Sequence, residues 1–480
     1  MGELKDKTLS GVKWNAVGRF STQGISFVIS VLLARILSPS DYGVVGMIGI
    51  FMAIAQTFID SGFGSALIRK KDCTDEDYST AFYFNIVVGI VCYFILFFSA
   101  PLIADFFDTP ILKDIVRVLS INLFLGSLTI VQAARLTAAV DFKSQAKISL
   151  VATIVSGCVG LFMAYSGYGV WSLVYQSVSS SVVRTILFWI VTKWRPQRTF
   201  SKHSFKYLFG FGSKILSASL LHTIYANLTT IIIGKYYTPK DLGYYARGES
   251  LATFPSSNIS GILQSVTFPI LSKIQDDDKR LISAYRKYIK ITSMVIFFGM
   301  FLLAAIAKPV ILTLLTEKWS ESIIYLQVFC FAWMFDHLCQ LNLNILYVKG
   351  RSDLVLKLEV IKKTISISMI VAAIPFGVLA ICISRALYTQ IAVLINTYYT
   401  GKLYGLGYRE QARDFIKYLL YSAIAVSPAF FLTFTETPSI VLILLGSIIS
   451  ILTYYILIKK DPIFTELMTL LKLRKKNYNR

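Results

Sequence analysis

The sequence is poor in charge, and poorest in negative charge. Only 16% of its 480 residues are charged, and 27 acidic residues stand against 48 lysines and arginines. In soluble domains about a quarter of the residues are charged, so this composition excludes an ordinary soluble fold. No gap between the apolar segments is long enough for a soluble domain either. The sequence therefore predicts an all-α integral membrane protein.

Residue types that bind metals or form disulfides are also scarce. The chain has three histidines and six cysteines, without an HExxH or CxxC pattern, and we expect the cysteines to be small core residues. The string Gly210-Phe211-Gly212-Ser213-Lys214 lacks the spacing of a phosphate-binding loop. We therefore predict no catalytic residue, no metal and no cofactor. Because no nucleotide-binding domain is recognisable, any transport must be driven by a gradient or the membrane potential.

Apolar residues, in contrast, make up 55% of the chain. Runs of about 20 apolar residues, the length that crosses a bilayer, recur along its whole length. We predict fourteen transmembrane helices, at residues 12–37, 42–68, 79–104, 112–136, 147–166, 169–192, 205–234, 241–270, 286–307, 320–348, 354–375, 378–400, 415–433 and 438–458. Three of these spans, 112–136, 241–270 and 354–375, carry charged residues inside them.

Lysines and arginines gather in alternate loops, for example Arg69-Lys70-Lys71 after the second span and Lys193 with Arg195 after the sixth. The loops between them hold few basic residues. By the positive-inside rule, both termini are expected in the cytoplasm, which agrees with an even number of spans. The net charge of +21 thus indicates topology and neighbouring anionic membrane lipids rather than nucleic acid binding.

Two stretches carry the same helix-start signal. Ser38-Pro39-Ser40-Asp41 and Thr238-Pro239-Lys240-Asp241 each combine a hydroxyl N-cap, proline at the first helical position and an acid at the third. An even number of spans lies between them, so both turns face the same side and indicate parallel repeats. We predict two six-helix bundles, residues 1–204 and 205–408, followed by an extra helix pair and basic cytoplasmic tail at 409–480. A substrate site is expected where the bundles meet.

The segments around these turns resemble a known family. They are Ser21 to Gly43, the DSGFGSALIR stretch from Asp60 to Arg69, and Gly243 through Ser272, with its GYYAR and FPILS strings. These segments are similar to the Wzx-type lipopolysaccharide and exopolysaccharide flippases, in the WzxC-like branch of the multidrug/oligosaccharidyl-lipid/polysaccharide exporter superfamily. The resemblance implies a bacterial cytoplasmic (inner) membrane transporter whose cargo is an undecaprenyl-pyrophosphate-linked oligosaccharide. Glycosyltransferases and a polysaccharide polymerase are its candidate partners.

Ionisable residues inside a span are costly and usually face a cavity or a partner. We predict a substrate cavity lined by Arg19, Arg184, Lys214, His222, Tyr225, Arg247, Glu249 and Arg385. Cations outnumber acids in this set, which suits the phosphates of a pyrophosphate. Asp60, Asp336 and His337 are candidates for ion coupling.

These residues also have structural interpretations. Arg19, Asp60 and Arg247 lie close enough to span ends to extend toward water. Lys214 could likewise reach the membrane interface. Asp336 and His337 could form a buried polar pair that holds helices together.

Three classes of function compete. The first is a flippase that moves lipid-linked oligosaccharide repeat units by alternating access, for lipopolysaccharide, capsule or exopolysaccharide synthesis. The second keeps the fold but carries lipid II, or exchanges a drug or cation; a drug exporter, however, needs anionic groups for cationic cargo. The third is a membrane enzyme that joins sugars on a lipid carrier, but the outward loops, none longer than about a dozen residues, are too short for its active site. Charge and repeat support a transporter and not an enzyme, and the family resemblance implies the flippase and its cargo.

Overall fold

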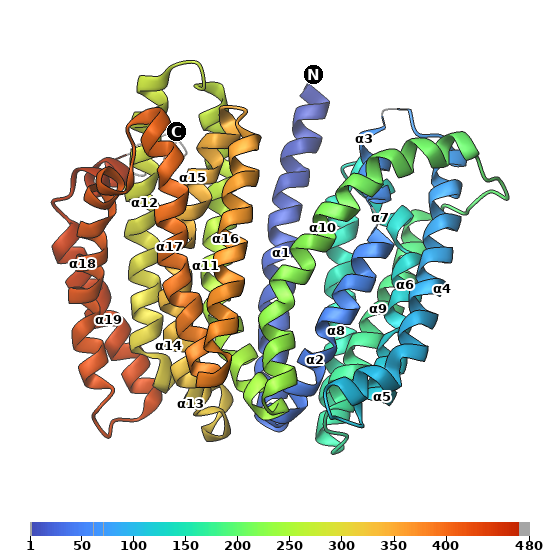
Figure 1. The fold of residues 1–480 in the computed structure, drawn as a ribbon, viewed down its shortest axis with the longest axis horizontal. Helices are drawn as coiled ribbons and strands as arrows, with labels where there is room; N and C mark the ends of the chain where they lie inside the picture. Colours follow the sequence, from blue (N-terminus) through green and yellow to red (C-terminus); the bar gives the residue numbers. More distant parts are fainter. Residues whose placement is uncertain (1, 61, 71, 470–480) are drawn as a thin grey trace. The chain divides into compact units, whose positions relative to one another are not determined.

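The computed structural model describes residues 2–60, 62–70 and 72–469, and the side chains of 2–13, 15, 259–260, 262–266 and 268–269 lie outside this description. Ser61, the side chains of Phe268 and Pro269, and residues 470–480 of the basic tail therefore lie outside the described residues. Every regular element in the described part of the chain is a helix (Figure 1). The prediction of an all-α fold is confirmed.

Eleven helices among the described residues are long and apolar enough to cross a membrane, or up to twelve if one bent pair forms a single span. That pair, Leu112–Ser127 with Ile130–Ala138, is bent by 40°. The predicted spans at 241–270 and 354–375 are helical too, as α11 (Pro239–Lys273) and α16 (Ser352–Ala373), but they are not among the eleven. All three segments carry charged residues inside them, and the count of fourteen stays a prediction.

The chain forms two compact units, Met1–Gly243 and Tyr244–Arg480. The helices of the first unit are α1 (Gly2–Ile36), α2 (Pro39–Asp60), α3 (Phe63–Arg69), α4 (Asp75–Phe106), α5 (Leu112–Leu119), α6 (Ile121–Ser127), α7 (Ile130–Ala138), α8 (Phe142–Tyr165), α9 (Trp171–Thr192), α10 (Lys202–Tyr236) and the start of α11. Helix α8 packs against both α1 and α9, while α10 packs against α2. The predicted boundary at residue 205 concerns the sequence repeat rather than compactness, and it stays a prediction.

The second unit contains most of α11 and the remaining helices. They are α12 (Asp278–Ala305), α13 (Ala307–Leu315), η1 (Glu317–Trp319), α14 (Ser322–Trp333), α15 (Asp336–Val348), α16, η2 (Ile374–Phe376), α17 (Val378–Tyr404), α18 (Tyr408–Leu432) and α19 (Ser439–Ile458). Helix α18 packs against α12 and α19, and α17 packs against α14, α15 and α16. Phe297, Phe329 and Tyr418 are fully buried in the core of this unit.

Both repeated turns cap their helices as the sequence predicts, and α2 and α11 begin at the two prolines. Asp41 Oδ2 accepts the Ser38 backbone N–H at 2.8 Å, and Ser38 Oγ accepts the Asp41 N–H at 3.2 Å. Thr238 and Asp241 form the same pair of bonds, at 3.1 and 3.2 Å. The two capping boxes are confirmed.

The two turns also pack directly on each other within the first unit. A Cβ added at Gly43 would lie 1.6 Å from the Pro239 carbonyl oxygen, and one at Gly243 would lie 1.9 Å from the Pro39 carbonyl oxygen. Each turn therefore contacts the equivalent residue of the other, and only glycine permits the approach. A two-fold relation between equivalent segments produces reciprocal contacts of this kind.

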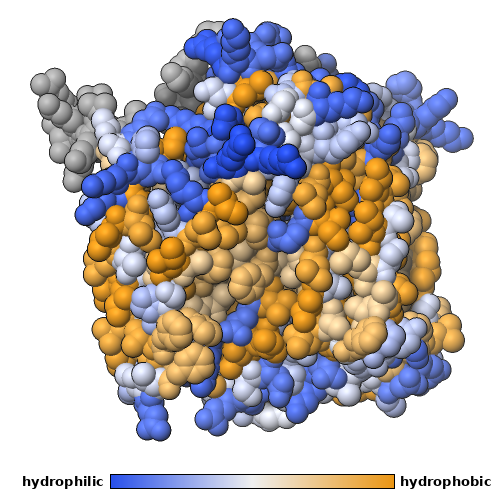
Figure 2. Space-filling view, turned by 60° about the vertical axis from the view of Figure 1, so that its left-hand side comes forward, coloured by the Kyte–Doolittle hydropathy of each residue, from blue (hydrophilic) through white to orange (hydrophobic). Residues whose placement is uncertain are grey.

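Much of the apolar surface remains exposed. On the face that Figure 2 shows, hydrophobic residues form a band, and hydrophilic residues gather at both ends of it. Helix α19 alone exposes Ile440, Leu444, Ile448 and Leu452. An apolar surface of this extent is suited to the hydrocarbon of a bilayer rather than to water.

The cysteine prediction holds for part of the set. Cys92, Cys330, Cys339 and Cys382 are buried, whereas Cys73 is half-buried and Cys158 is exposed. The assignment of Cys158 to the core is wrong, because this residue shares the exposed apolar face of α8 with residues such as Val151 and Phe162. An apolar residue in a span can face lipid as readily as the core, and hydrophobicity alone does not separate the two.

Candidate functional site

A polar cavity lies in the first unit between α1, α8 and α9. Its volume is 410 Å³, and its lining consists of Ser26, Ile29, Thr153, Ser156, Leu173, Gln176, Ser177, Ser180, Ser181 and Arg184. Arg184, a predicted cavity residue, is the one charged side chain in this lining. The other polar groups are hydroxyls and one amide, all in the central parts of their helices.

A second cavity follows the same seam between α1 and α8. It has a volume of 390 Å³ and is lined by Gly18, Arg19, Thr22, Gln23, Phe142, Gln145, Ala146 and Ser149. Arg19 is exposed and lies about two helical turns from Ser26 along α1. The structure thus places Arg19 and Arg184 at neighbouring cavities along one helix pair, and their role in substrate binding stays a prediction.

Helix α10 carries three further predicted cavity residues in the first unit. Lys214 and His222 are exposed, and Tyr225 is half-buried. On another side of α10, the Thr223 hydroxyl lies 3.1 Å from the Thr57 hydroxyl of α2. Exposure leaves Lys214 and His222 accessible, and their role in substrate binding stays a prediction.

The predicted cavity residues of the second unit are paired with one another. Arg385 Nη1 lies 2.5 Å from Glu249 Oε1 and also hydrogen-bonds the Tyr245 hydroxyl. The Phe329 ring packs on the same guanidinium, with its centroid 5.3 Å from Cζ. The Arg385 charge is therefore already compensated inside the unit, which reduces what it can offer to a ligand.

Arg247 is buried, with 8% of its surface exposed, and its guanidinium carbon lies 5.3 Å from the centre of the Trp319 ring. This geometry is that of a cation–π contact. In this structure, Arg247 packs in the interior of the second unit. Its predicted role in the substrate cavity stays a prediction.

The three candidates for ion coupling lie in different surroundings. Asp60 ends α2, is exposed and accepts a hydrogen bond from Gln56 Nε2 at 3.0 Å. Asp336 begins α15, directly after the break that follows α14. The next residue, His337, is 2% exposed, and its Nε2 lies 3.0 Å from the Ser293 hydroxyl. Ion coupling by these residues stays a prediction.

Several polar clusters were not found by sequence reasoning. In the second unit, Asp414 is 3% exposed and binds Arg286 through two bonds of 2.7 and 2.8 Å. Lys290 reaches the same carboxylate at 3.2 Å. The spacing of Arg286 and Lys290 on α12 marks a shared basic face, but nothing local points to a partner 128 residues away.

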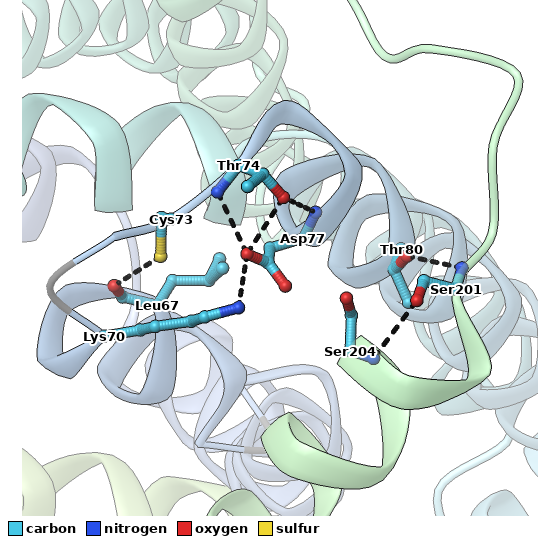
Figure 3. A network of polar contacts seen from close by, with 8 residues as sticks. All are labelled: Leu67, Lys70, Cys73, Thr74, Asp77, Thr80, Ser201 and Ser204. Carbon is cyan, nitrogen blue, oxygen red and sulfur yellow. Dashed lines mark hydrogen bonds and ion pairs between the residues drawn. The ribbon is translucent and has the colours of Figure 1, made fainter.

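A second such cluster closes one end of the first unit (Figure 3). Asp77 Oδ2 accepts hydrogen bonds from Lys70 Nζ at 2.6 Å and from the Thr74 backbone N–H at 2.9 Å. Nearby, the Ser201 N–H donates to Thr80 Oγ1 at 3.0 Å, which joins the start of α10 to α4. The cluster ties Lys70 to the start of α4 and joins α4 to the start of α10, so we interpret it as structural.

The polar face of α9 was also missed, although the sequence contains its signal. Gln176, Ser177, Ser180, Ser181 and Arg184 fall within about 140° of a helical wheel at 100° per residue. Sequence reasoning had singled out Arg184 alone from this helix. Serine is a weak marker in a transmembrane helix, because its hydroxyl can bond to its own backbone.

The described residues contain no group of three or more histidine, cysteine, aspartate or glutamate side chains placed to hold a metal ion. The polar groups that line the two cavities are hydroxyls, amides and the guanidinium groups of Arg19 and Arg184. Such groups bind and orient polar ligands through hydrogen bonds and charge.

A family model described as "Polysaccharide biosynthesis protein" matches residues 32–324. The chain belongs to this family. The match begins near the end of α1 and ends in α14, so it includes the α8 and α9 residues that line the cavities, and Glu249, but not the cavity-lining residues of α1. The resemblance to polysaccharide flippases that the sequence motifs indicate is confirmed.

Curated relatives agree with this family. The teichuronic acid biosynthesis protein TuaB of Bacillus subtilis (strain 168) is 26% identical over 356 residues, or 74% of each chain. The lipopolysaccharide biosynthesis protein WzxC of Escherichia coli (strain K12) is 25% identical over 396 residues, covering 82% of this chain and 80% of the relative. Among solved structures, the lipid II flippase MurJ in an inward closed conformation is similar, with a TM-score of 0.75 at 15% identity. That likeness covers 93% of this chain and 98% of MurJ, and it shows the fold.

Proposed function

We propose that this protein is a flippase that moves undecaprenyl-pyrophosphate-linked oligosaccharide repeat units across the bacterial inner membrane for polysaccharide assembly. The observation that carries the proposal is the family match across α1 to α14, together with relatives named for teichuronic acid and lipopolysaccharide biosynthesis. Such transport needs a chain of several apolar membrane-spanning helices with polar cavities between them, and this chain has both. The protein carries lipid-linked sugars and performs no reaction on them.

Alternating access between two parallel repeats is the proposed mechanism. Two observations support it: each repeat begins its second helix with the same capping box, and the two turns contact each other reciprocally through Gly43 and Gly243. In the proposal, fourteen helices cross the membrane, both termini are cytoplasmic, and spans 13 and 14 are an appended pair. A polysaccharide polymerase and glycosyltransferases are the proposed partner proteins.

The cationic residues accessible in the first unit are proposed to receive the cargo's charged groups. Arg19 and Arg184 lie at cavities, and Lys214 is exposed on α10. Guanidinium groups bind phosphate and carboxylate through paired hydrogen bonds. A drug or cation antiporter needs the opposite charge, so it is not favoured. The fold shared with a lipid II flippase does not decide the cargo, because one fold carries different substrates.

Reconstitution tests this function directly. The full-length protein in liposomes, loaded with a fluorescent lipid-linked oligosaccharide, is expected to expose the inner-leaflet label to a membrane-impermeant quencher. Liposomes without protein provide the control for spontaneous exchange. Exchange no faster than in protein-free liposomes contradicts the proposal. Rescue of a strain that lacks its lipid II flippase would instead assign the chain to lipid II.

A further inference from the structure

Helix α9 has two faces of opposite character. Val182, Ile186 and Ile190 are exposed apolar residues that share one face, as the lipid-facing side of a span does. The opposite face carries the polar stripe from Gln176 to Arg184 that lines the cavity with α1 and α8. Arg184 therefore points away from the lipid-facing side, into the polar cavity.

The cavity owes its shape to close packing around it. A Cβ added at Gly157 of α8 would lie 2.2 Å from Cδ1 of Ile29, and one at Gly160 would lie 3.0 Å from Cβ of Gln176. Ile29 and Gln176 both line the cavity. Gly157 and Gly160 of α8 thus allow α1 and α9 to pack closely against α8. The cavity is therefore bounded by close contacts between helices.

The lining has hydrogen-bonding capacity that the protein does not use. The side chains of Ser26, Thr153, Gln176 and Ser180 form no hydrogen bond within the described residues. Arg184 has no ion-pair partner in the described part of the chain. Unpaired polar groups at the depth of a membrane span are costly. Their hydrogen bonds must therefore be completed by water or by a ligand.

The chemistry of the lining residues restricts the class of ligand that the cavity can bind. A hydroxyl side chain donates and accepts hydrogen bonds, which matches the hydroxyls of a sugar ring. One guanidinium without a carboxylate partner suits a single planar anion, and it disfavours a cation. The volume of 410 Å³ lies in the range of small-molecule sites, about 300–1,000 Å³. A monosaccharide that carries one carboxylate satisfies all three requirements.

We infer that the cavity between α1, α8 and α9 is a binding subsite for an acidic sugar residue of the cargo. Arg184 binds the sugar's carboxylate, while the hydroxyls of α1, α8 and α9 bind its ring hydroxyls. The inference rests on the proposed function, and it deepens it by giving the site a preference for uronate-type sugars. No covalent step is involved.

Binding to the purified full-length protein tests the subsite without transport. The probes are a glucuronate-containing oligosaccharide and the same oligosaccharide after reduction of its carboxyl group, measured by calorimetry. We expect the acidic form to bind about tenfold more tightly than the reduced form. In Arg184→Gln this preference should disappear while affinity for the reduced form is kept. Arg184→Lys should retain part of the preference, because it keeps the charge but loses the two-pronged geometry.

Matched serine variants separate the cavity from the rest of α9. The double substitution of Ser180 and Ser181 by alanine should weaken binding of both probes about fivefold. Ser179→Ala is the control, since this residue lies on the same helix outside the lining and its hydroxyl bonds to the Gln176 carbonyl at 3.0 Å. It should change neither affinity. Thermal unfolding of each variant shows whether the fold is intact.

Several results would overturn the subsite. Equal affinity of the wild-type protein for the two probes, or no detectable binding of either, contradicts it. A preference that survives in Arg184→Gln also contradicts it, as does inorganic phosphate that binds to the cavity as tightly as the acidic oligosaccharide. The proposed function fails separately, when the wild-type protein moves no lipid-linked oligosaccharide in liposomes. A working flippase without sugar selectivity would therefore reject this inference alone.

Discussion

The two units of the chain treat intramembrane charge in opposite ways. In the first unit, Arg19 and Arg184 line cavities whose polar groups are largely unpaired. In the second unit, Arg385 binds Glu249 and Tyr245, and Arg247 packs on Trp319. A charge inside a bilayer must be hydrated or neutralised. The difference separates charges that are available to a ligand from charges that hold the fold.

This contrast makes the first unit the better place to look for cargo contacts. Eight intramembrane residues were proposed as one cavity from their charge and position. In the first unit, Arg184 lines a cavity and has no ion-pair partner in the described part of the chain, whereas Glu249 and Arg385 in the second unit bind each other. Charge in a span is thus a reliable sign of a constrained residue, but only its partner shows which constraint applies.

The largest expected effect comes from breaking the ion pair of the second unit. Glu249→Gln leaves Arg385 without its carboxylate and should lower the free energy of unfolding by about 3 kcal/mol. Joint replacement of Glu249 and Arg385 by methionine should recover most of that loss, since an apolar pair needs no compensation. Thermal unfolding in detergent measures both. Arg184→Gln provides the contrast, with unchanged unfolding; a comparable loss there would erase the distinction between the units.

The next effect concerns the glycine contacts of the first unit. Gly43→Ala forces a methyl group against the Pro239 carbonyl and should destabilise the protein by about 2 kcal/mol, with Gly243→Ala similar. Gly49→Ala is the matched control on the same helix, because nothing lies within 4 Å of an added Cβ there. The control should be neutral or slightly stabilising through helix propensity. Equal unfolding temperatures for Gly43→Ala and Gly49→Ala would refute the packing argument.

A smaller effect on stability, but a large one on transport, is expected at Lys214. Lys214→Ala should reduce polymer export and leave unfolding unchanged, because the side chain is exposed. Arg247→Ala should instead lower stability by about 1–2 kcal/mol through loss of its contact with Trp319. Export in cells and unfolding in detergent are measured in parallel. Normal export with Lys214→Ala would remove this residue from the proposed cavity.

The smallest effect is a pH dependence at the end of α19, outside the membrane spans. Burial opposes ionisation of Asp461, but Lys417, the Ile463 backbone N–H and the Tyr418 hydroxyl outweigh it and hold the pKa of this carboxyl below its usual value of 3.8. A lowered folded-state pKa contributes stability above about pH 5, and the contribution is lost as pH falls through the folded pKa.

Docking of residues 462–469 should therefore weaken on acidification, as measured by limited proteolysis with a protease active at low pH. Asp461→Asn should show weak docking at every pH. Residues that stay equally protected in this variant would show that Asp461 does not hold the segment.

Sequence reasoning recovered the parts of this fold that depend on local physics. Apolar runs gave the helices, and the residue types at Ser38 to Asp41 gave both the cap and the starting residue of α2. Gly43, Gly46 and Gly49 share a helical spacing, but an added Cβ would meet a neighbour within 4 Å only at Gly43 and Gly46. Periodicity places residues on a face, but it does not say which of them meets a neighbour.

Pairings between distant segments were beyond the reach of the sequence. Arg385 and Glu249 were both singled out, yet nothing in their positions showed that they bind each other across 136 residues. Asp414 was not singled out at all, because a carboxylate near a span end is ordinary until its partners Arg286 and Lys290 are known. Pairing depends on tertiary contacts, and a single sequence does not contain them explicitly.

The contact between Gly43 and Pro239 restricts the substitutions that the two turns can accept. At both glycines the neighbour is backbone, which cannot rotate away as a side chain can. A larger residue at either glycine would therefore clash with the backbone of the other turn. The contact between the two turns therefore requires glycine at both positions. Once one copy changes, the chain must either revert or give up the contact.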